Sequence, residues 1–311
     1  MAMNIDAPEH KATPQPAFDT LLDKWITWLT QYPTPHHALS RLMHKLTRVK
    51  WGPWKRWQLS WFVRKYNVDM SIAVDPNLES YTDFNTFFTR ALKLDARPIA
   101  LDPRAIACPV DGAVSQAGPI KDGNIFQAKG MHYDLRSLLG GSTARAEPFR
   151  NGQFATLYLS PRDYHRIHMP LRGELVEMVY VPGRLFSVNP RTAANVPALF
   201  SRNERVVAIF KTDHGPLAMI LVGAMFVANI ETKWAGVVAP NASNDIRVWN
   251  YENASKTQEK IILDKGTEMG RFNMGSTVIL LFGPGTMKWA AQLTPGTAIQ
   301  MGMEIGTLPS N

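Results

Sequence analysis

"RFNMGSTVILLFG", residues 271–283, joins a Gly-Ser-Thr step, Gly275-Ser276-Thr277, to an unbroken apolar run. A short apolar run bounded by turn residues predicts a buried β-strand. Such a strand would hold the Ser276 hydroxyl rigidly against a core. The same tripeptide at residues 141–143 is followed by small and charged residues, so Ser142 is predicted to lie in a loop.

Similar runs recur on both sides of this stretch and predict the fold class. They are short, and Gly, Pro and Asn separate them, which is typical of antiparallel strands. No long helical pattern alternates with them, so a doubly wound sheet is disfavoured. We predict a mainly β (α+β) protein with an antiparallel sandwich or barrel-like core and N-terminal amphipathic helices. The other runs are "FATLYLS" (154–160), "GELVEMVYVPG" (173–183), "RVVAIFKT" (205–212), "LAMILVGAMFVANIE" (217–231) and "AGVVAP" (235–240).

The N-terminal part has a different character and carries the positive charge. Lys and Arg number 34 against 26 Asp and Glu, a net charge of +8, and no acidic residue occurs between Lys24 and Val68. Six of the nine tryptophans lie in the same segment, so its helices suit a lipid headgroup layer. Packing on the protein's own core is the alternative reading, and nucleic acid is disfavoured because no binding module is recognisable.

These patterns divide the chain into three parts. Residues 1–16 are polar and Pro-containing, so we expect a disordered tail without a signal peptide. Residues 17–68 would form the basic, Trp-rich helices, and residues 69–311 the β-rich catalytic domain. Within the latter, residues 80–92 predict one short helix capped by Ser80. A single cysteine, Cys108, excludes an internal disulfide.

The densest group of chemically active side chains is "LSPRDYHRIHMPLRG", residues 159–173. His165 and His168 lie three residues apart, and histidine can take and return a proton near neutral pH. Structural histidines and a metal site remain alternatives, although no Cys cluster or HExxH frame accompanies the pair. We therefore predict no metal.

An aspartate and a glycine complete the candidate chemistry. Asp111 precedes Gly112, which is a hairpin-turn signal, yet a carboxylate could also orient a histidine beside a serine. Neither Gly-Ser-Thr step has the G-x-S-x-G elbow of an α/β-hydrolase. With no side chain at Gly275, its carbonyl is the nearest electrophile for an activated Ser276, and attack there would be self-cleavage.

Six motifs, in this order along the chain, resemble the bacterial phosphatidylserine decarboxylase proenzymes. The resemblance runs from about residue 54 to 286, and Met274 stands where the family usually has Leu. The motifs are "PVDGAVSQAG", "QAKGMHYDLRSLL", "SPRDYHRIHMP", "YVPGRLFSVNP", "SRNERVV" and "KGTEMGRFNMGSTVILLF".

The resemblance implies cleavage between Gly275 and Ser276 and conversion of Ser276 to a covalent pyruvoyl group. Asp111 and His168 would form a triad with Ser276 for this step, and His165 would serve proton transfer to the substrate. The two resulting chains, α and β, would stay associated. The pyruvoyl ketone would accept electrons while phosphatidylserine loses carbon dioxide and becomes phosphatidylethanolamine.

An anionic lipid substrate implies a peripheral protein at the cytoplasmic face of the inner membrane. Two further hypotheses stay open on the residues alone: a metal-dependent or serine lipid hydrolase, and a membrane-surface adaptor using residues 17–66. The sequence leaves the oligomeric state undetermined, a homodimer included.

Overall fold

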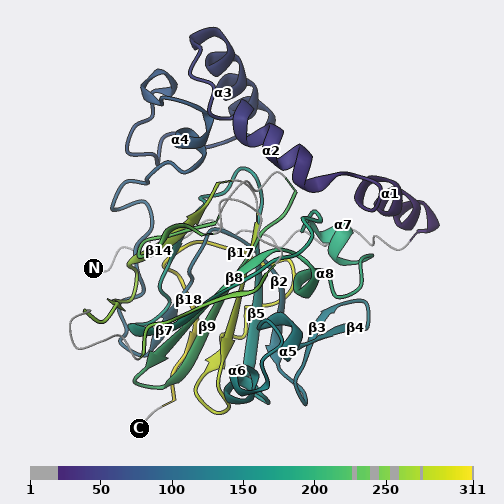
Figure 1. The fold of residues 1–311 in the computed structure, drawn as a ribbon. Helices are drawn as coiled ribbons and strands as arrows, with labels where there is room; N and C mark the ends of the chain where they lie inside the picture. Colours follow the sequence, from purple (N-terminus) through teal and green to yellow (C-terminus); the bar gives the residue numbers. More distant parts are fainter. Residues whose placement is uncertain (1–19, 226–229, 239–244, 253–258, 274–275, 310–311) are drawn as a thin grey trace.

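The computed structural model describes residues 20–225, 230–238, 245–252, 259–273 and 276–309 (Figure 1). The expected tail at 1–16 and the residue Gly275 lie outside these ranges. In Figure 1 the N-terminal helices form a lobe above one end of a body built of strands.

A nine-stranded antiparallel sheet forms the centre of this body, and β15 lies in its interior. All seven residues of β15 are buried, and the strand is paired with β5 on one side and β9 on the other. The strand predicted from the opening stretch is therefore confirmed. The order across the sheet is β12 (Arg247–Asn250), β7 (Gly173–Val181), β8 (Arg205–Thr212), β9 (Gly215–Val222), β15 (Ser276–Phe282), β5 (Gln153–Leu159), β2 (Gly112–Pro119) and β17 (Ala298–Ile299), with β13 (Ile262–Leu263) paired to β7.

Three smaller antiparallel sheets accompany it. Most of the buried apolar side chains form one continuous cluster between the sheets, which gives a sandwich-like core. The mainly β, antiparallel prediction is confirmed, whereas the described strands form no closed barrel. The small sheets contain β11 (Gly236–Val238), β10 (Ile230–Thr232), β14 (Glu268–Phe272) and β6 (Arg166–His168); β1 (Ala105–Ala107), β18 (Glu304–Thr307) and β16 (Lys288–Trp289); and β3 (Asn124–Ala128) with β4 (Met131–Asp134).

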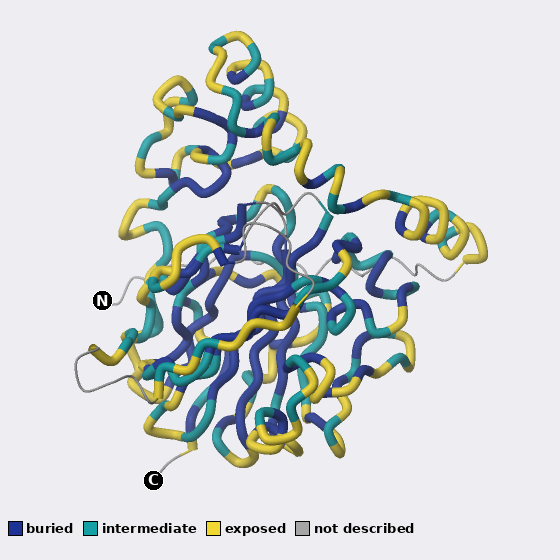
Figure 2. Tube along the Cα trace, in the orientation of Figure 1, coloured by how far each residue is buried: buried dark blue, intermediate teal, exposed yellow. Residues whose placement is uncertain are grey.

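The expected N-terminal helices are present. They are α1 (Leu21–Gln31), α2 (His36–Leu46) and α3 (Gly52–Tyr66). The Thr20 hydroxyl accepts the Asp23 amide and begins α1, while Asn67 ends α3 in the left-handed conformation. Figure 2 shows that much of this lobe's surface is exposed, in contrast to the dark interior of the sheet.

The helix expected within residues 80–92 is shorter and starts later than predicted. It is α4 (Phe84–Phe88), and Asp83 caps it by accepting the Thr86 amide at 2.8 Å. Ser80 instead ends a 3₁₀ turn, Leu78–Ser80. Asp83 is the favoured cap because its own backbone amide also donates to the Thr86 hydroxyl. Two otherwise unpaired backbone amides are thus satisfied together.

A small apolar cluster joins α3 to α4 and leads toward the sheet. It comprises Leu59, Phe62, Val68, Phe84, Phe87 and Phe88. The remaining helical elements are single turns on the body: α5 (Leu135–Leu138), α6 (Thr143–Ala146), the 3₁₀ turn Glu147–Phe149, α7 (Pro190–Ala193) and α8 (Leu199–Arg202). Ser142, predicted to lie in a loop, caps α6 through its hydroxyl.

Candidate active site

Ser276 is the first residue of the central strand β15. Its side chain is completely buried, and its Oγ has no hydrogen-bond partner among the described residues. The register pairs Ser276 with Leu159, the last residue of β5. The hydroxyl is thus held at the end of a rigid strand, and a reaction at Oγ would not have to break a hydrogen bond to any described residue.

Asp111 reaches the same end of the sheet through β2, on the other side of β5. Gly112 makes this approach feasible, because a Cβ there would lie 2.1 Å from the Tyr158 carbonyl oxygen. The Asp-Gly step is therefore not a hairpin: β1 pairs with β18, whereas β2 pairs with β5 and β17. A glycine was needed for close strand packing, and local sequence could not distinguish that from a turn.

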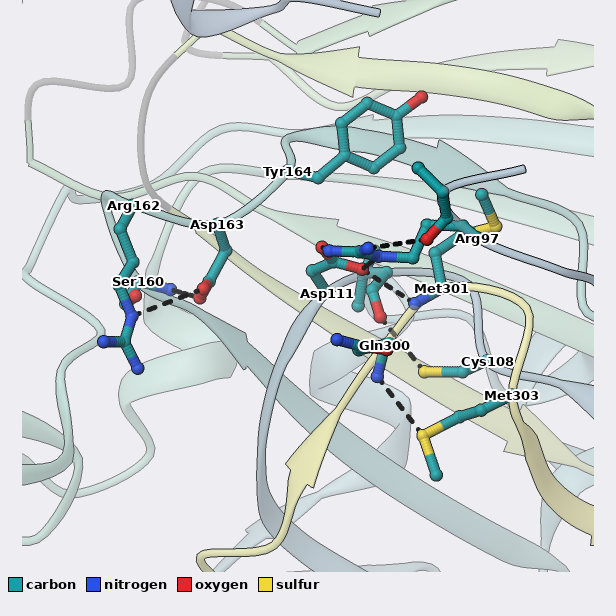
Figure 3. A network of polar contacts seen from close by, with 12 residues as sticks. Arg97, Cys108, Asp111, Ser160, Arg162, Asp163, Tyr164, Gln300, Met301 and Met303 are labelled. Atoms are coloured by element: carbon teal, nitrogen blue, oxygen red, sulfur yellow. Dashed lines mark hydrogen bonds and ion pairs between the residues drawn. The ribbon is translucent and has the colours of Figure 1, made fainter. Parts of the chain in front are cut away.

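The carboxylate of Asp111 is bound by Arg97, not by a histidine. Arg97 Nε lies 2.9 Å from Oδ1, its Nη2 lies 2.6 Å from Oδ2, and the Met301 amide donates to Oδ1 at 2.8 Å (Figure 3). His168 and Asp111, both described residues, do not form the expected hydrogen bond with each other. The physical reason is that a buried guanidinium binds both carboxylate oxygens at once, which a single imidazole N–H cannot do.

His168 is oriented by a backbone carbonyl instead. Its Nδ1 lies 2.8 Å from the Gly266 carbonyl, which can only accept, so Nδ1 carries the hydrogen. Its Nε2 is then the acceptor for the Tyr164 hydroxyl at 3.1 Å. Burial lowers the pKa of His168, and the hydrogen bond to the Gly266 carbonyl, the charge of Glu268 and, least, the charge of Asp111 oppose that shift. The result is a neutral imidazole whose basic nitrogen, Nε2, accepts from the Tyr164 hydroxyl.

His165 occupies a dry position beside it. The ring stacks on Phe88 at 4.1 Å between centroids, and its Nε2 lies 3.1 Å from the Ser160 carbonyl. Burial, reinforced by the charge of Arg90, lowers the pKa of His165 to about 3. Its Nδ1 has no partner among the described residues. The backbone amide of Phe272, four residues before Ser276, donates to the His165 carbonyl at 3.0 Å.

Three residues near this site were missed by sequence reasoning. Arg97 and Arg90 reach the site through contacts that are distant in sequence, and neither belongs to a recognised motif. Tyr164 lies within residues 159–173, but no role was predicted for it. Both arginines lie within "FFTRALKLDARPI", residues 87–99, and no sequence signal there indicated that either would be buried. Within the described ranges, no group of three or more His, Cys, Asp or Glu residues is arranged to hold a metal ion.

A cavity of about 270 Å³ connects the N-terminal lobe with this end of the sheet. Phe62 and Tyr66 of α3 line one side, while Phe88, Leu159 and Pro161 belong to its other walls. Since Leu159 is the register partner of Ser276, the cavity lies beside the strand end that carries the serine, although Ser276 itself does not line it.

Comparison with known proteins identifies the family of the chain. A family model described as phosphatidylserine decarboxylase matches residues 84–307, and a second, described as PSD, matches residues 26–67. The proenzyme of this decarboxylase from Bordetella petrii is 56% identical over 280 residues, covering 90% of this chain and 96% of the relative.

Two other relatives carry the same printed name. The Pseudomonas putida protein is 56% identical, covering 89% of this chain and 96% of its own. The Pseudomonas fluorescens protein is 53% identical, covering 91% and 98%. On these matches and on the ordered motifs, the chain belongs to the phosphatidylserine decarboxylase family.

Proposed function

We propose that this protein cleaves itself between Gly275 and Ser276 and then uses a pyruvoyl group at residue 276 to convert phosphatidylserine into phosphatidylethanolamine and carbon dioxide. The observation that carries the proposal is the buried, unpartnered Ser276 hydroxyl at the start of β15. Family membership supports the decarboxylation, and the proenzyme names of the relatives support processing.

Self-cleavage begins with proton transfer from Ser276. His168 supplies the base, because its Nε2 carries the lone pair and is bound by nothing stronger than the Tyr164 hydroxyl. The proton reaches Nε2 directly after Tyr164 turns away, or through the Tyr164 hydroxyl. The negative charges of Glu268 and, more weakly, Asp111 favour the imidazolium, while Arg97 and the Met301 amide hold the Asp111 carboxylate in place.

The reaction then proceeds in three steps, and water is the only further reactant. Oγ bonds to the Gly275 carbonyl carbon and the peptide C–N bond breaks, which gives an ester. The freed nitrogen takes the proton that His168 removed from Oγ. Elimination then removes the Cα proton of residue 276 to a base, breaks the Cβ–O bond, releases the Gly275 carboxylate and leaves a dehydroalanine. Water adds and ammonia leaves, so residue 276 becomes a pyruvoyl group whose ketone supplies an electron sink for decarboxylation.

The residues around position 276 fit such a group. The position is dry, since Ser276 and Thr277 are both fully buried, and a ketone there is shielded from bulk water. His165 donates from Nε2 to the Ser160 carbonyl, so the unpartnered Nδ1 of its neutral ring carries the lone pair. We assign to it proton transfer at the substrate stage: Nδ1 takes a proton from the substrate amine and returns it to the product carbon.

Both chains would stay associated after cleavage. The segment from residue 276 onward supplies β15, which is hydrogen-bonded on both edges, and also β17 and β18, which pair with β2 and β1. Met301, in the small chain, bonds to Asp111, in the large one. Separation would expose the interior of the main sheet, so the chains are held together by the core itself.

The purified protein tests the proposal directly. We expect two bands on a denaturing gel, the smaller of roughly 4 kDa for 36 residues of ordinary composition. Intact mass should show a carbonyl in place of the amine at its N-terminus, and phosphatidylserine should release carbon dioxide. An active protein with one intact chain and an unmodified Ser276 would refute the proposal.

The second part of the proposal is that the protein associates peripherally with the cytoplasmic face of the inner membrane. Helix α1 exposes five large apolar side chains, a patch that soluble surfaces rarely carry. No helix among the described residues is long and apolar enough to cross a bilayer. The exposed residues are Leu21, Leu22, Trp25, Trp28 and Leu29.

Replacing Leu21 and Leu22 together with serine should weaken binding to phosphatidylserine-containing vesicles by about 10- to 100-fold, because two apolar side chains leave the lipid. Vesicle flotation measures the effect. The matched control replaces Leu94 and Leu101, which are even more exposed than Leu21 and Leu22 but lie outside the N-terminal helices. Equal losses in the two double variants would argue against α1 as the membrane contact.

A further inference from the structure

Arg90 is a buried cation whose hydrogen bonds are largely unmade. The residue is 4% exposed, and the one hydrogen bond that it makes to a described residue runs from Nη2 to the Arg162 carbonyl at 3.3 Å. Its Nε and Nη1 are buried without a partner among the described residues. A buried guanidinium that lacks acceptors is costly, so such a group needs an explanation.

Other arginines in shielded positions are satisfied, which makes Arg90 an exception. Arg205, 2% exposed, donates from all three nitrogens to backbone carbonyls at 2.6–2.8 Å. Three more are paired with a carboxylate: Arg97 with Asp111, Arg145 with Glu177 and Arg166 with Glu268.

Arg90 lies beside the candidate active site. It follows Phe88, which stacks on His165, and Thr89, whose carbonyl accepts Arg166 Nε at 2.9 Å. Its charge acts on His165 and on Asp111. Phe88 and Pro161 are walls of the cavity that leads to Leu159, and Arg90 bonds to the residue after Pro161. The cation therefore lies behind the part of the cavity lining formed by Phe88 and Pro161, and it is not itself a lining residue.

We propose that Arg90 binds the phosphodiester of the lipid headgroup, with Nε and Nη1 as the donors; this rests on the proposed function. In phosphatidylserine only three atoms separate the phosphorus from the amine nitrogen that reacts at residue 276. An anion site close to the reacting position is thus what the substrate requires. Arginine suits it, because its rigid array of N–H donors matches phosphate oxygens.

The carboxylate of the same substrate is the competing ligand, and the chemistry disfavours it. Decarboxylation moves the carboxylate charge away as carbon dioxide departs. An ion pair with Arg90 would stabilise that charge in the ground state more than in the transition state and would slow the step. The phosphodiester keeps its charge throughout, so binding it costs the reaction nothing.

The experiment compares Arg90→Gln and Arg90→Lys with a matched control, Arg162→Gln. Arg162 is the neighbour whose side chain is 66% exposed, and its substitution leaves the carbonyl that Arg90 binds. Calorimetry measures affinity for glycerophosphoethanolamine, which has the phosphodiester and no carboxylate, and for L-serine, which has the reverse. Steady-state kinetics with phosphatidylserine in detergent micelles gives KM and kcat.

We expect Arg90→Gln to cleave itself normally, to bind glycerophosphoethanolamine about 10- to 100-fold more weakly and to raise KM by a similar factor. L-Serine affinity should not change, Arg90→Lys should fall between, and Arg162→Gln should match the wild type. Weaker binding of L-serine alone would overturn the phosphodiester assignment.

Measuring self-cleavage of the wild type and the Arg90 variants shows whether the proposed function or the Arg90 proposal has failed. If the wild type never forms two chains, the proposed function fails. If the wild type does and neither Arg90 variant does, Arg90 belongs to folding or maturation, and the lipid-binding proposal is overturned.

Discussion

Ser276→Ala will leave the protein as a single uncleaved chain, with self-cleavage slowed by at least about a thousandfold, because no other group replaces the nucleophile. Stability should not fall. The wild-type hydroxyl is buried without a partner among the described residues, so removing it relieves an unpaired polar group. A denaturing gel over time and a urea unfolding curve measure the two effects.

The second Gly-Ser-Thr step provides the control. Ser142→Ala removes the cap of α6, which should cost about 1 kcal/mol of unfolding free energy, and should cleave at the wild-type rate. Cleavage of Ser276→Ala at residue 275, or failure of Ser142→Ala to mature while folded, would contradict the assignment.

His168→Ala should slow self-cleavage by about 10²- to 10⁴-fold, the usual contribution of a general base. The Tyr164 hydroxyl and the Gly266 carbonyl lose their shared partner, and a space of imidazole size remains. Added imidazole should therefore restore part of the rate. Incubation of freshly refolded precursor, sampled on gels, measures it.

The pH dependence of wild-type cleavage tests the same role. Burial lowers the pKa of His168 below its ordinary 6.5, so the imidazole stays unprotonated to more acidic pH. The rate should hold at neutral pH and decline only below about 6.5. Replacement of the exposed His132 is the control for a generic histidine loss. A His168→Ala protein that matures at the wild-type rate would remove His168 from the mechanism.

Local pattern predicted the elements well, because periodicity reports burial directly. The uninterrupted run after Ser276 forms an interior strand, and the helices expected within residues 17–68 are α1, α2 and α3. The helix beginning at Phe84 was misplaced by a few residues, because capping depended on which of two polar residues found a reciprocal partner.

The sequence by itself determined the strands, the basic Trp-rich helices and, through ordered motifs, the family and the candidate catalytic residues. Tertiary structure decided the partners of those residues. Asp111 binds Arg97 and the Met301 amide, His168 binds Gly266, and Arg90 lies buried beside His165 with two nitrogens unpartnered among the described residues. Periodicity in the sequence specifies which face of an element is buried. Strand register, in contrast, brings residues that are distant in the chain to one end of the sheet. There, burial and competition among donors decide which hydrogen bonds form.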